Sequence, residues 1–298
     1  MRLRPARLQC SRLSGRDILL AEGNMKILQK VEECSESYGC SFVPTMGALH
    51  KGHITLIKAA LKTDRPCVVS IFVNPKQFGP KEDYSKYPRM PDSDLAICRQ
   101  LGVSAVFMPD EKIMYPPEFK TVVSIPTLSN CLCGLSRKGH FDGVATVVAR
   151  LFGIVKPAEA FFGWKDAQQL IIIKRMVDDL ALGIKIHGIE TVREADGLAL
   201  SSRNLYLSDA ERKTAPNLYK GLKLGEAAAQ NSTAGVVIET ARQYIESSGL
   251  MIDYVDLRRI SDLSAVDYQK KLDAKEQYLL ASAVFCGSVR LIDNVKIF

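Results

Sequence analysis

The residues best suited to chemistry are His50 and His53, which flank Gly52 in the segment PTMGALHKGHITLI at positions 44–57. The pattern predicts a strand, a Met-Gly turn and a helix that opens at the histidines. Backbone N–H groups and the positive dipole end at a helix start suit a phosphate, and Gly52 is expected to let it approach closely. Two imidazoles there can stabilise the charge that develops during phosphoryl transfer. The alternatives are two surface histidines or a metal site, which lacks obvious further ligands.

A second strand-to-helix turn, FGWKDAQQL at positions 162–170, carries side chains suited to the same ligand. Gly163 is expected to permit the turn. Lys165 can neutralise phosphate charge, and Asp166 can hold ribose hydroxyls or cap the following helix. The turn therefore predicts a second nucleotide contact.

Two further loops carry polar side chains. LSSRN (200–204) follows a strand and an Asp-Gly turn. Its hydroxyls can donate to phosphate oxygens and its guanidinium can grip them bidentately, although the string alone is equally typical of a solvated loop. SIFVNPKQFGP (70–80) is a strand that runs into a Pro/Gly loop, where amides can donate to a carboxylate or hydroxyls without adding charge; Asn-Pro also fits a simple turn. These candidates are Ser201, Ser202, Arg203, Asn74 and Gln77.

The elements that must position these side chains alternate along the first two thirds of the chain. Apolar, β-branched runs predict strands at 40–47, 66–74, 103–109, 159–163 and 183–192, and amphipathic segments predict helices at 53–63, 92–102, 143–157 and 167–182. This alternation predicts an α/β fold with a doubly wound parallel sheet. In such sheets, ligands bind at the carboxyl ends of the strands, where the candidate residues stand.

The pattern changes after residue 190. Helices are predicted at 211–230 and 233–249, followed by strands at 251–260 and within 278–298, which is typical of a smaller α+β unit. No Pro- or Ser-rich linker separates the two parts, so the boundary is expected to be a hinge. The predicted organisation is a basic extension (1–23), an α/β domain (24–190) and a C-terminal α+β domain (191–298).

Charge and apolar length exclude several classes of protein. The chain has 298 residues and a net charge of +7, but five arginines stand among the first 16 residues, and the remainder carries 35 basic against 33 acidic groups. The excess is therefore no sign of a nucleic-acid-binding face. The Arg-rich, acid-poor start resembles an organellar transit peptide, or is a disordered or wrongly assigned extension. The apolar stretch at 278–289 falls short of the ~20 residues that span a bilayer, so a cytoplasmic protein without membrane contact is expected.

The eight cysteines predict free thiols in a reducing compartment. Several stand in apolar runs, where cysteine packs as a small hydrophobe. Cys131 and Cys133 form a C-x-C pair without a second pair at zinc-finger spacing, so a metal or reactive role is the less favoured interpretation.

The histidine motif resembles a known signature. TMGALHKGH is similar to the ATP-binding His-x-Gly-His signature of the nucleotidyltransferase superfamily, which includes the class I aminoacyl-tRNA synthetases. Five blocks in order then resemble the pantothenate synthetase (pantoate–β-alanine ligase) family: FVPTMGALHKGH, SIFVNPKQFGPKEDYSKYPR, GHFDGVATVV, FFGWKDAQQL and VREADGLALSSRNLYLS. They span residues 42–208, and the resemblance implies a Rossmann-like α/β domain with a smaller C-terminal lid domain.

The resemblance implies an ATP-dependent ligase that condenses pantoate with β-alanine through a pantoyl adenylate, releasing AMP and pyrophosphate. It implies Mg²⁺ held through the ATP phosphates rather than in a protein metal site, and a homodimer.

The resemblance also implies roles for single residues. Gln77 would contact both pantoate and β-alanine, Gln169 would contact pantoate, and the backbone of Val192 would contact adenine. The ATP signature adds Met46 and Gly47, and the pocket lining adds Arg137 and His140. Trp164 stands where bacterial members commonly carry glutamate. Tyr84, Tyr87 and Arg89 would shape the pocket or a subunit contact. His187, on an apolar strand, is expected to be structural.

Two rival functions remain at this point. Another nucleotidylyltransferase of the superfamily would share the His-x-Gly-His turn but would not need the QFGP and KDAQQ blocks. A non-enzymatic RNA-binding or assembly protein on a Rossmann-like scaffold would need a basic stripe beyond the N-terminal extension, and the charge distribution offers none.

Overall fold

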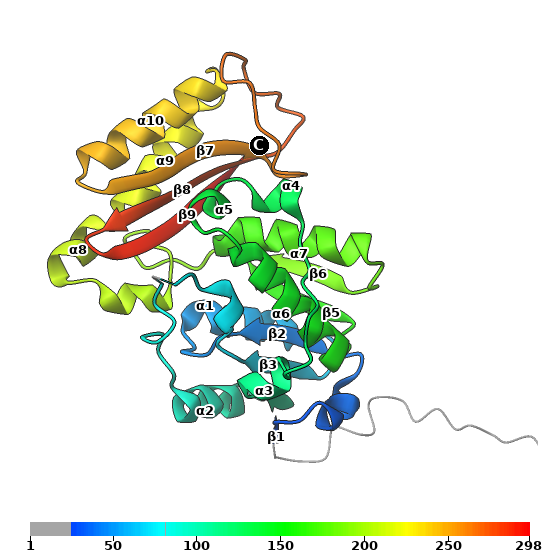
Figure 1. Ribbon diagram of the computed structural model, residues 1–298. Helices are drawn as coiled ribbons and strands as arrows, with labels where there is room; N and C mark the ends of the chain where they lie inside the picture. The colour runs from blue at the N-terminus through cyan, green and yellow to red at the C-terminus, as the bar shows by residue number, and fades with distance from the viewer. Residues whose placement is uncertain (1–24, 81) are drawn as a thin grey trace, which may run out of the picture.

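A computed structural model describes residues 25–80 and 82–298; the predicted basic extension at 1–23 lies outside the described residues. The first part of the chain forms a six-stranded, wholly parallel sheet in the order β1-β4-β3-β2-β5-β6 (Figure 1). The strands are β1 (Lys26–Leu28), β2 (Ser41–Thr45), β3 (Cys67–Ile71), β4 (Ala105–Phe107), β5 (Glu159–Gly163) and β6 (Lys185–Ile189). The predicted doubly wound fold is confirmed, with β1 as an additional edge strand that no sequence pattern indicated.

The strand order reverses between β2 and β5. From β2 the chain proceeds outward through β3 and β4, and it returns to place β5 and β6 on the other side of β2. Loops that leave two neighbouring strands in opposite directions open a crevice at their carboxyl ends. The histidine turn follows β2 and the Lys165 turn follows β5, so the topology brings the two predicted phosphate contacts together.

Helices cover both faces of this sheet. They are α1 (Lys51–Ala60), α2 (Pro91–Leu101), α6 (His140–Val155) and α7 (Ala167–Asp179), with short helices α3 (Glu111–Met114), α4 (Pro126–Ser129) and α5 (Cys133–Ser136). Successive strand residues point to opposite faces. Phe42 and Phe162 accordingly pack in the cluster with α6 and α7, whereas Val43 and Phe161 pack in the cluster with α1 and α2.

The C-terminal part is a three-stranded antiparallel sheet with two helices on one face. The strands β7 (Met251–Arg259), β8 (Tyr278–Cys286) and β9 (Val289–Ile297) lie in that order. Helices α9 (Asn217–Ala228) and α10 (Ala234–Ser247) pack on one face through Leu280, while Leu279 and Ala281 join the core of the first sheet. The single helix predicted at 211–230 is two helices, since α8 (Asp209–Thr214) ends before Pro216, which cannot continue a helix without strain.

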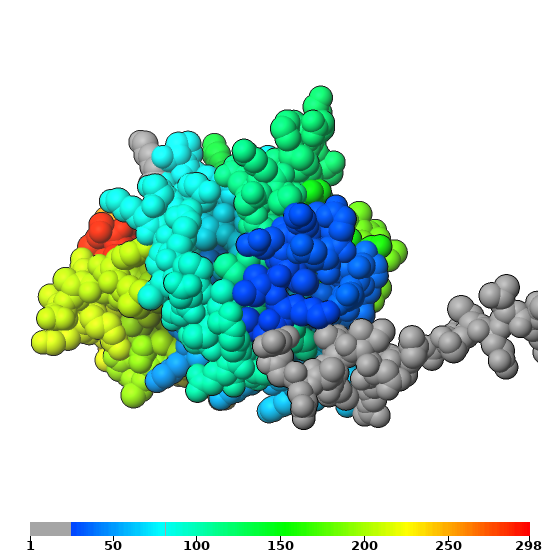
Figure 2. Space-filling model, turned by 90° about the horizontal axis from the view of Figure 1, so that it is seen from below, coloured from blue at the N-terminus to red at the C-terminus, as the bar shows by residue number. Residues whose placement is uncertain are grey.

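The remaining features are the exposed edge of the first sheet and the length of the helices. Seen from below in Figure 2, the blue surface just after residue 24 lies beside cyan-to-green surface, at the sheet edge where β1 pairs with β4. Within the described residues, no helix combines the length and apolarity needed to cross a membrane.

Candidate functional site

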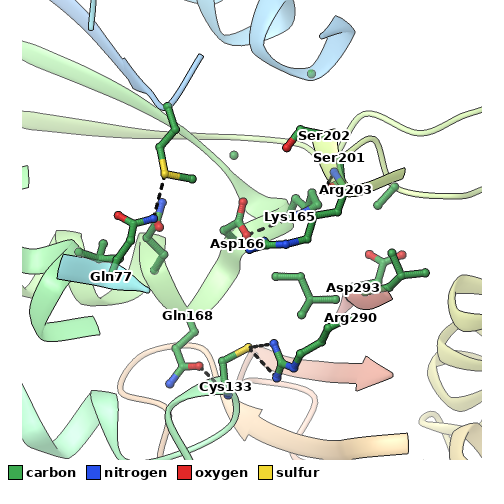
Figure 3. A pocket seen from close by; sticks show the side chains of 18 of the residues that line it. Gln77, Cys133, Lys165, Asp166, Gln168, Ser201, Ser202, Arg203, Arg290 and Asp293 are labelled. Carbon is green, nitrogen blue, oxygen red and sulfur yellow. Dashed lines mark hydrogen bonds and ion pairs between the residues drawn. The ribbon is translucent and has the colours of Figure 1, made fainter. Parts of the chain in front are cut away.

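A cavity of about 910 Å³ opens at the carboxyl ends of β2 and β5, between the two sheets (Figure 3). Its walls come from the histidine turn, the loop after β3, the start of α6, the turn after β5, the segment 190–206 and strand β9. Of the residues predicted from the sequence, it is lined by Met46, His50, Gly52, His53, Asn74, Gln77, Arg137, His140, Gly163, Lys165, Asp166, Gln169, Val192, Ser201, Ser202 and Arg203. Tyr87 lines it as well, whereas Gly47, Tyr84 and Arg89 do not.

The two histidines cap the helix that carries them. The His50 imidazole Nδ1 accepts the backbone N–H of Gly52 at 3.1 Å, and the His53 Nδ1 accepts the backbone N–H of His50 at 3.3 Å. Both rings therefore satisfy N–H groups that a helix start leaves without partners. The rings stack with centroids 4.0 Å apart and planes 29° apart.

These contacts fix the tautomer of both histidines. A backbone N–H can only donate, so each Nδ1 is an acceptor and the proton of the neutral ring resides on Nε2. Burial lowers the pKa of His50 to about 4, with Lys165 adding to the shift. Burial and the neighbouring His50 lower that of His53 to about 3. At neutral pH the site therefore presents two uncharged imidazoles with Nε2–H donors.

The turn before the histidines depends on a residue that the sequence pattern did not reveal. Gly47 and Ala48 both have positive φ, 79° and 49°. The carboxylate of Asp94, on α2 and 1% exposed, accepts the backbone N–H groups of Ala48 at 2.9 Å and Leu49 at 2.8 Å. A Cβ at Gly47 would lie 2.9 Å from that carboxylate, so Gly47 shapes the turn from behind the cavity.

The structure gives Gly52 a different role from the one expected. A Cβ on Gly52 would lie 2.8 Å from Cε1 and 2.9 Å from Nδ1 of His50. Distances below 3.0 Å force one group to move, so Gly52 is needed first for the stacked histidine cap.

The turn after β5 places Lys165 and Asp166 in the 3-10 helix η3 (Trp164–Asp166). The Lys165 ammonium lies 3.5 Å from the Asp166 carboxylate. Burial alone would raise the pKa of Asp166, but the charges of Lys165 and Arg203 outweigh it and lower the pKa. Asp166 makes no side-chain cap to α7, so the capping alternative is not realised.

Gly163 also differs from expectation. Its φ of −86° and ψ of 139° are extended backbone that any residue adopts, and a Cβ there would make only an ordinary contact at 3.9 Å. The turn does not require glycine. What Gly163 provides is an open stretch of cavity wall.

The Ser-Ser-Arg segment opens the 3-10 helix η4 (Ser202–Tyr206). The Ser201 hydroxyl oxygen accepts the Arg203 N–H at 3.3 Å as its cap, which leaves the hydroxyl hydrogen free to donate. The Arg203 guanidinium donates to both carboxylate oxygens of Asp83, at 3.2 and 3.0 Å. Tyr87 lies 3.3 Å from the Ser202 hydroxyl. Asp83 was not indicated by the sequence. Its carboxylate forms an ion pair with Arg203, the cation predicted to bind phosphate.

The amide of Asn74 is fully engaged within the protein. Its Nδ2 donates to Gln77 Oε1 at 3.0 Å and to Gly143 O at 3.1 Å, while Oδ1 accepts the Tyr115 hydroxyl at 2.7 Å. Only 1% of Asn74 is exposed. The Gln77 Nε2 lies 3.1 Å from Met46 Sδ. Asn74 is therefore built to orient Gln77, a correction to its expected direct contact with substrate.

Arg137 and His140 organise the same loop from helix α6 and the turn before it. The Arg137 guanidinium donates to both carboxylate oxygens of Glu82, at 2.8 and 2.5 Å. His140 Nδ1 lies 2.7 Å from the carbonyl of Gln77 and its Nε2 lies 2.9 Å from Arg137. A carbonyl only accepts and a guanidinium only donates, so His140 is neutral with its proton on Nδ1. Burial and Arg137 lower its pKa to about 4.

The two glutamines of the KDAQQ block separate. Gln169 lines the cavity, whereas Gln168 is 6% exposed and donates to the carbonyls of Leu128 and Cys131 at 2.9 and 2.8 Å. Gln168 therefore faces the interior and ties α7 to the segment before α5.

The remaining candidates are structural in character. Seven cysteines, Cys133 among them, are buried and free, and residues 25–80 and 82–298 contain no group of three or more His, Cys, Asp and Glu arranged for a metal ion. His187 pairs with Glu159 at 2.7 Å and stacks on Phe161 with centroids 4.5 Å apart. It does not line the cavity.

Comparison with known proteins agrees with this geometry. A sequence profile described as pantoate-beta-alanine ligase matches residues 22–296. The chain belongs to the pantoate–β-alanine ligase family. The pantothenate synthetase of Thermosipho africanus is 45% identical over 283 residues, which are 92% of this chain and 100% of that one. That of Bacillus subtilis is 43% identical over 265 residues, 88% of this chain and 91% of that one.

Solved structures of the family are similar as well. Pantothenate synthetase from Thermus thermophilus superposes with a TM-score of 0.85 at 40% identity, over 91% of this chain and 99% of that one. The Francisella tularensis ligase, complexed with beta-gamma ATP and beta-alanine, gives 0.75 at 34% identity, over 91% and 97%. The chain is thus an enzyme that ligates pantoate to β-alanine in an ATP-dependent reaction, and the activity predicted from the five sequence blocks is confirmed.

Proposed function

We propose that the ligation proceeds in two steps in the cavity between the sheets. In the first, a pantoate carboxylate oxygen attacks the α-phosphorus of ATP, the bond to the β-phosphate oxygen breaks, and pyrophosphate leaves. In the second, the neutral amine of β-alanine attacks the acyl carbon, AMP leaves with the electron pair of the anhydride bond, and the amine loses a proton. The observation that carries this proposal is that two Nε2–H donors and two cations, Lys165 and Arg203, line one cavity.

His50 and His53 serve the first step as donors. Their Nε2–H groups bind oxygens of the α-phosphate and stabilise the negative charge that grows as pyrophosphate departs. A neutral donor is suited to this role because it is already oriented by its cap and requires no proton transfer. The stacked rings fix the distance between the two donors.

The cations and hydroxyls hold the β- and γ-phosphates. Lys165 contributes a point charge, while Arg203 exchanges its Asp83 carboxylate for phosphate oxygens of the same bidentate geometry. Ser201 and Ser202 donate their hydroxyl hydrogens to the same group. Mg²⁺ enters bound to the phosphates of ATP, in keeping with its preference for substrate phosphate oxygens and water.

The acyl substrates and the nucleoside occupy the rest of the cavity. Gln77 and Gln169 hold the hydroxyls and carboxylate of pantoate, and Gln77 also meets β-alanine. Asn74, Arg137 and His140 position the Gln77 loop rather than contact the reacting atoms. For the nucleoside, the ribose binds Asp166 and the adenine binds the backbone of Val192. Met46 packs near them, on the turn that Gly47 shapes.

On a larger scale, residues 24–190 form the ATP- and pantoate-binding domain, and residues 191–298 form a domain that closes over it. We further infer a homodimer, which sedimentation equilibrium tests, and a cytoplasmic enzyme. Import of a fusion of residues 1–23 to a reporter protein tests the organellar alternative.

Pyrophosphate release tests the two steps. With Mg-ATP and pantoate alone, we expect release of one equivalent per active site, and addition of β-alanine should convert this burst into continuous turnover. Release that requires all three substrates from the first turnover would contradict a separate pantoyl adenylate. A burst that survives in His53→Ala at the wild-type rate would leave the two steps intact and remove the histidines from the first.

A further inference from the structure

Strand β9 reaches from the C-terminal sheet into the turn that carries Lys165. The side chain of Asn294, 7% exposed, donates from Nδ2 to the backbone carbonyl of Trp164 at 2.9 Å and to that of Lys165 at 3.0 Å. Both hydrogens of one amide thus hold two consecutive carbonyls of η3. A 3-10 turn of three residues has few backbone hydrogen bonds of its own, so these two contacts determine where it points.

The preceding residue of β9 holds the other phosphate-binding segment. The Asp293 carboxylate, 3% exposed, accepts hydrogen bonds from both terminal nitrogens of the Arg193 guanidinium, at 2.6 and 2.9 Å. Arg193 in turn donates to the Gly197 carbonyl at 3.1 Å and lies 3.6 Å from the centroid of the Tyr219 ring. Because Arg193 also forms a β-bridge with Ala199, the segment that leads to Ser201 is fixed to the same point of β9.

The two contacts are joined in the backbone of β9 itself. The Asp293 carboxylate accepts the backbone N–H of Asn294 at 2.8 Å, so it is held against the backbone of the residue that carries the amide. Two residues of the C-terminal sheet therefore tie together the turn after β5 and the Ser-Ser-Arg segment.

We propose that Asn294, supported by Asp293, is a positioning residue for ATP: it fixes the η3 turn so that Lys165 and Asp166 face the nucleotide. The proposal rests on the phosphate role given to Lys165 above. It makes the C-terminal sheet a working part of the ATP site as well as a cover over it.

The sole tryptophan of the chain provides a direct report on this turn. Trp164 belongs to η3, its ring lies 4.7 Å from the Lys296 ammonium, and a Cβ on Gly188 would lie 2.7 Å from its Nε1. Any displacement of the turn changes the surroundings of the indole. Tryptophan emission therefore measures the geometry of the turn independently of catalysis.

The test uses the full-length enzyme with Asn294→Asp, which keeps the shape of the side chain but replaces its two N–H donors with a carboxylate oxygen facing two carbonyls. We expect the KM for ATP to rise about tenfold or more, because two hydrogen bonds to the turn are lost. The KM for β-alanine should stay within about twofold, and the Trp164 emission and its response to ATP should change. Asn231→Asp, the same substitution at an exposed position, should alter none of these quantities.

Lys165→Ala, measured in parallel, separates the two ideas. If Lys165→Ala leaves the KM for ATP unchanged, the phosphate role of Lys165 fails, whatever Asn294→Asp does. If Lys165→Ala is impaired while Asn294→Asp lowers only the melting temperature, with wild-type KM for ATP and wild-type tryptophan response, Asn294 is a structural strut and the proposal is overturned. Asn294→Ser, whose hydroxyl restores one donor, should give an intermediate KM and provides the test if the aspartate variant does not fold.

Discussion

The two sides of the ATP cavity are held in place by different kinds of contact. On the histidine side, the contacts that orient the rings join residues two and three positions apart. On the cationic side, Arg203 is oriented by Asp83, 120 positions away, and the Lys165 turn by Asn294, 129 positions away. The histidine cap forms with α1 itself, although the turn before it also needs Asp94 of α2, whereas the second side requires the loop after β3 and the C-terminal sheet to be in place. The rings are thus oriented by local contacts, and the cations by the assembled fold.

The same contrast applies to charge. The histidines reach the cavity neutral and already protonated on the nitrogen they use. Arg203 is instead paired with the Asp83 carboxylate, which phosphate would have to displace under the proposed function. We therefore expect substitutions on the histidine side to act mainly on kcat, and substitutions on the cationic side to act mainly on the KM for ATP.

The largest effect is expected from His53→Ala. Loss of one donor to the transferring phosphoryl group should reduce kcat by about a hundredfold or more, with a small change in the KM for ATP. Steady-state rates with saturating ATP and pantoate measure it. His187→Ala is the matched control, because His187 does not line the cavity, and this variant should keep its kcat per folded enzyme. A His53→Ala enzyme with near-normal kcat would break the comparison.

Gly52→Ala tests whether the helix cap formed by His50 is needed for activity as well as for stability. The added methyl would lie 2.8 Å from the His50 ring, so the ring must leave its cap. We expect kcat to fall about tenfold and the unfolding free energy to fall by about 1 kcal/mol through the weakened cap. Urea unfolding and steady-state rates provide both measurements. Gly153→Ala on α6, where a Cβ meets nothing within 4 Å, should keep activity and raise stability by up to about 1 kcal/mol.

The same contrast explains what the sequence could predict. The period-two and helical patterns gave the central strands and their crossovers, and the helix start gave His50 and His53, because each of these depends on neighbours in the chain. Edge strand β1, with three residues, is too short for a pattern. The single helix predicted at 211–230 is wrong at Pro216, where proline itself signals a break between two helices.

The residues that sequence reasoning missed have partners remote in the chain. Asp83, Asp94 and Asn294 show no local spacing that would reveal their role, because each acts on backbone or a cation from another element. Asn74 has the same character, because its amide is engaged by the carbonyl of Gly143, 69 positions away. Gly52 differs, because the group that needs the absent Cβ is the His50 ring, two positions away.

A smaller effect, in the opposite direction, is expected from Asp83→Asn. Removing the carboxylate frees Arg203 for phosphate, so the KM for ATP should fall about threefold, as suits an ion pair of less than about 1 kcal/mol at partly exposed groups. The kcat should change little. Asp267→Asn, which removes an exposed partner of Lys270, is the matched control. A rise in the KM for ATP would mean that Asp83 supports nucleotide binding instead of competing with it.

The effect furthest from catalysis is expected in the dependence of stability on pH, where the two sides of the cavity titrate in separate windows. The pKa values of His50, His53 and His140 are lowered to about 4, 3 and 4, from the ordinary value of 6.5. Between those limits the unfolded chain binds more protons than the native one, so stability rises with pH and is lost as the pH falls below 6.5. Asp166 has a lowered pKa, so its contribution is lost only below about 4.

Melting temperatures at pH 7, 6, 5 and 4.5 check this separation. We expect a fall of more than about 10 °C over that range, because each of the three histidines costs about 1.4 kcal/mol per pH unit below 6.5. The fall should be shallower in His53→Asn, because one group that must be neutral in the native state has been removed. Asp166→Asn should follow the wild-type curve down to pH 4.5 and diverge only below it. If Asp166→Asn flattens the curve above pH 5 while His53→Asn does not, the acid sensitivity belongs to the cationic side, and the neutral state of the histidines would have to be abandoned.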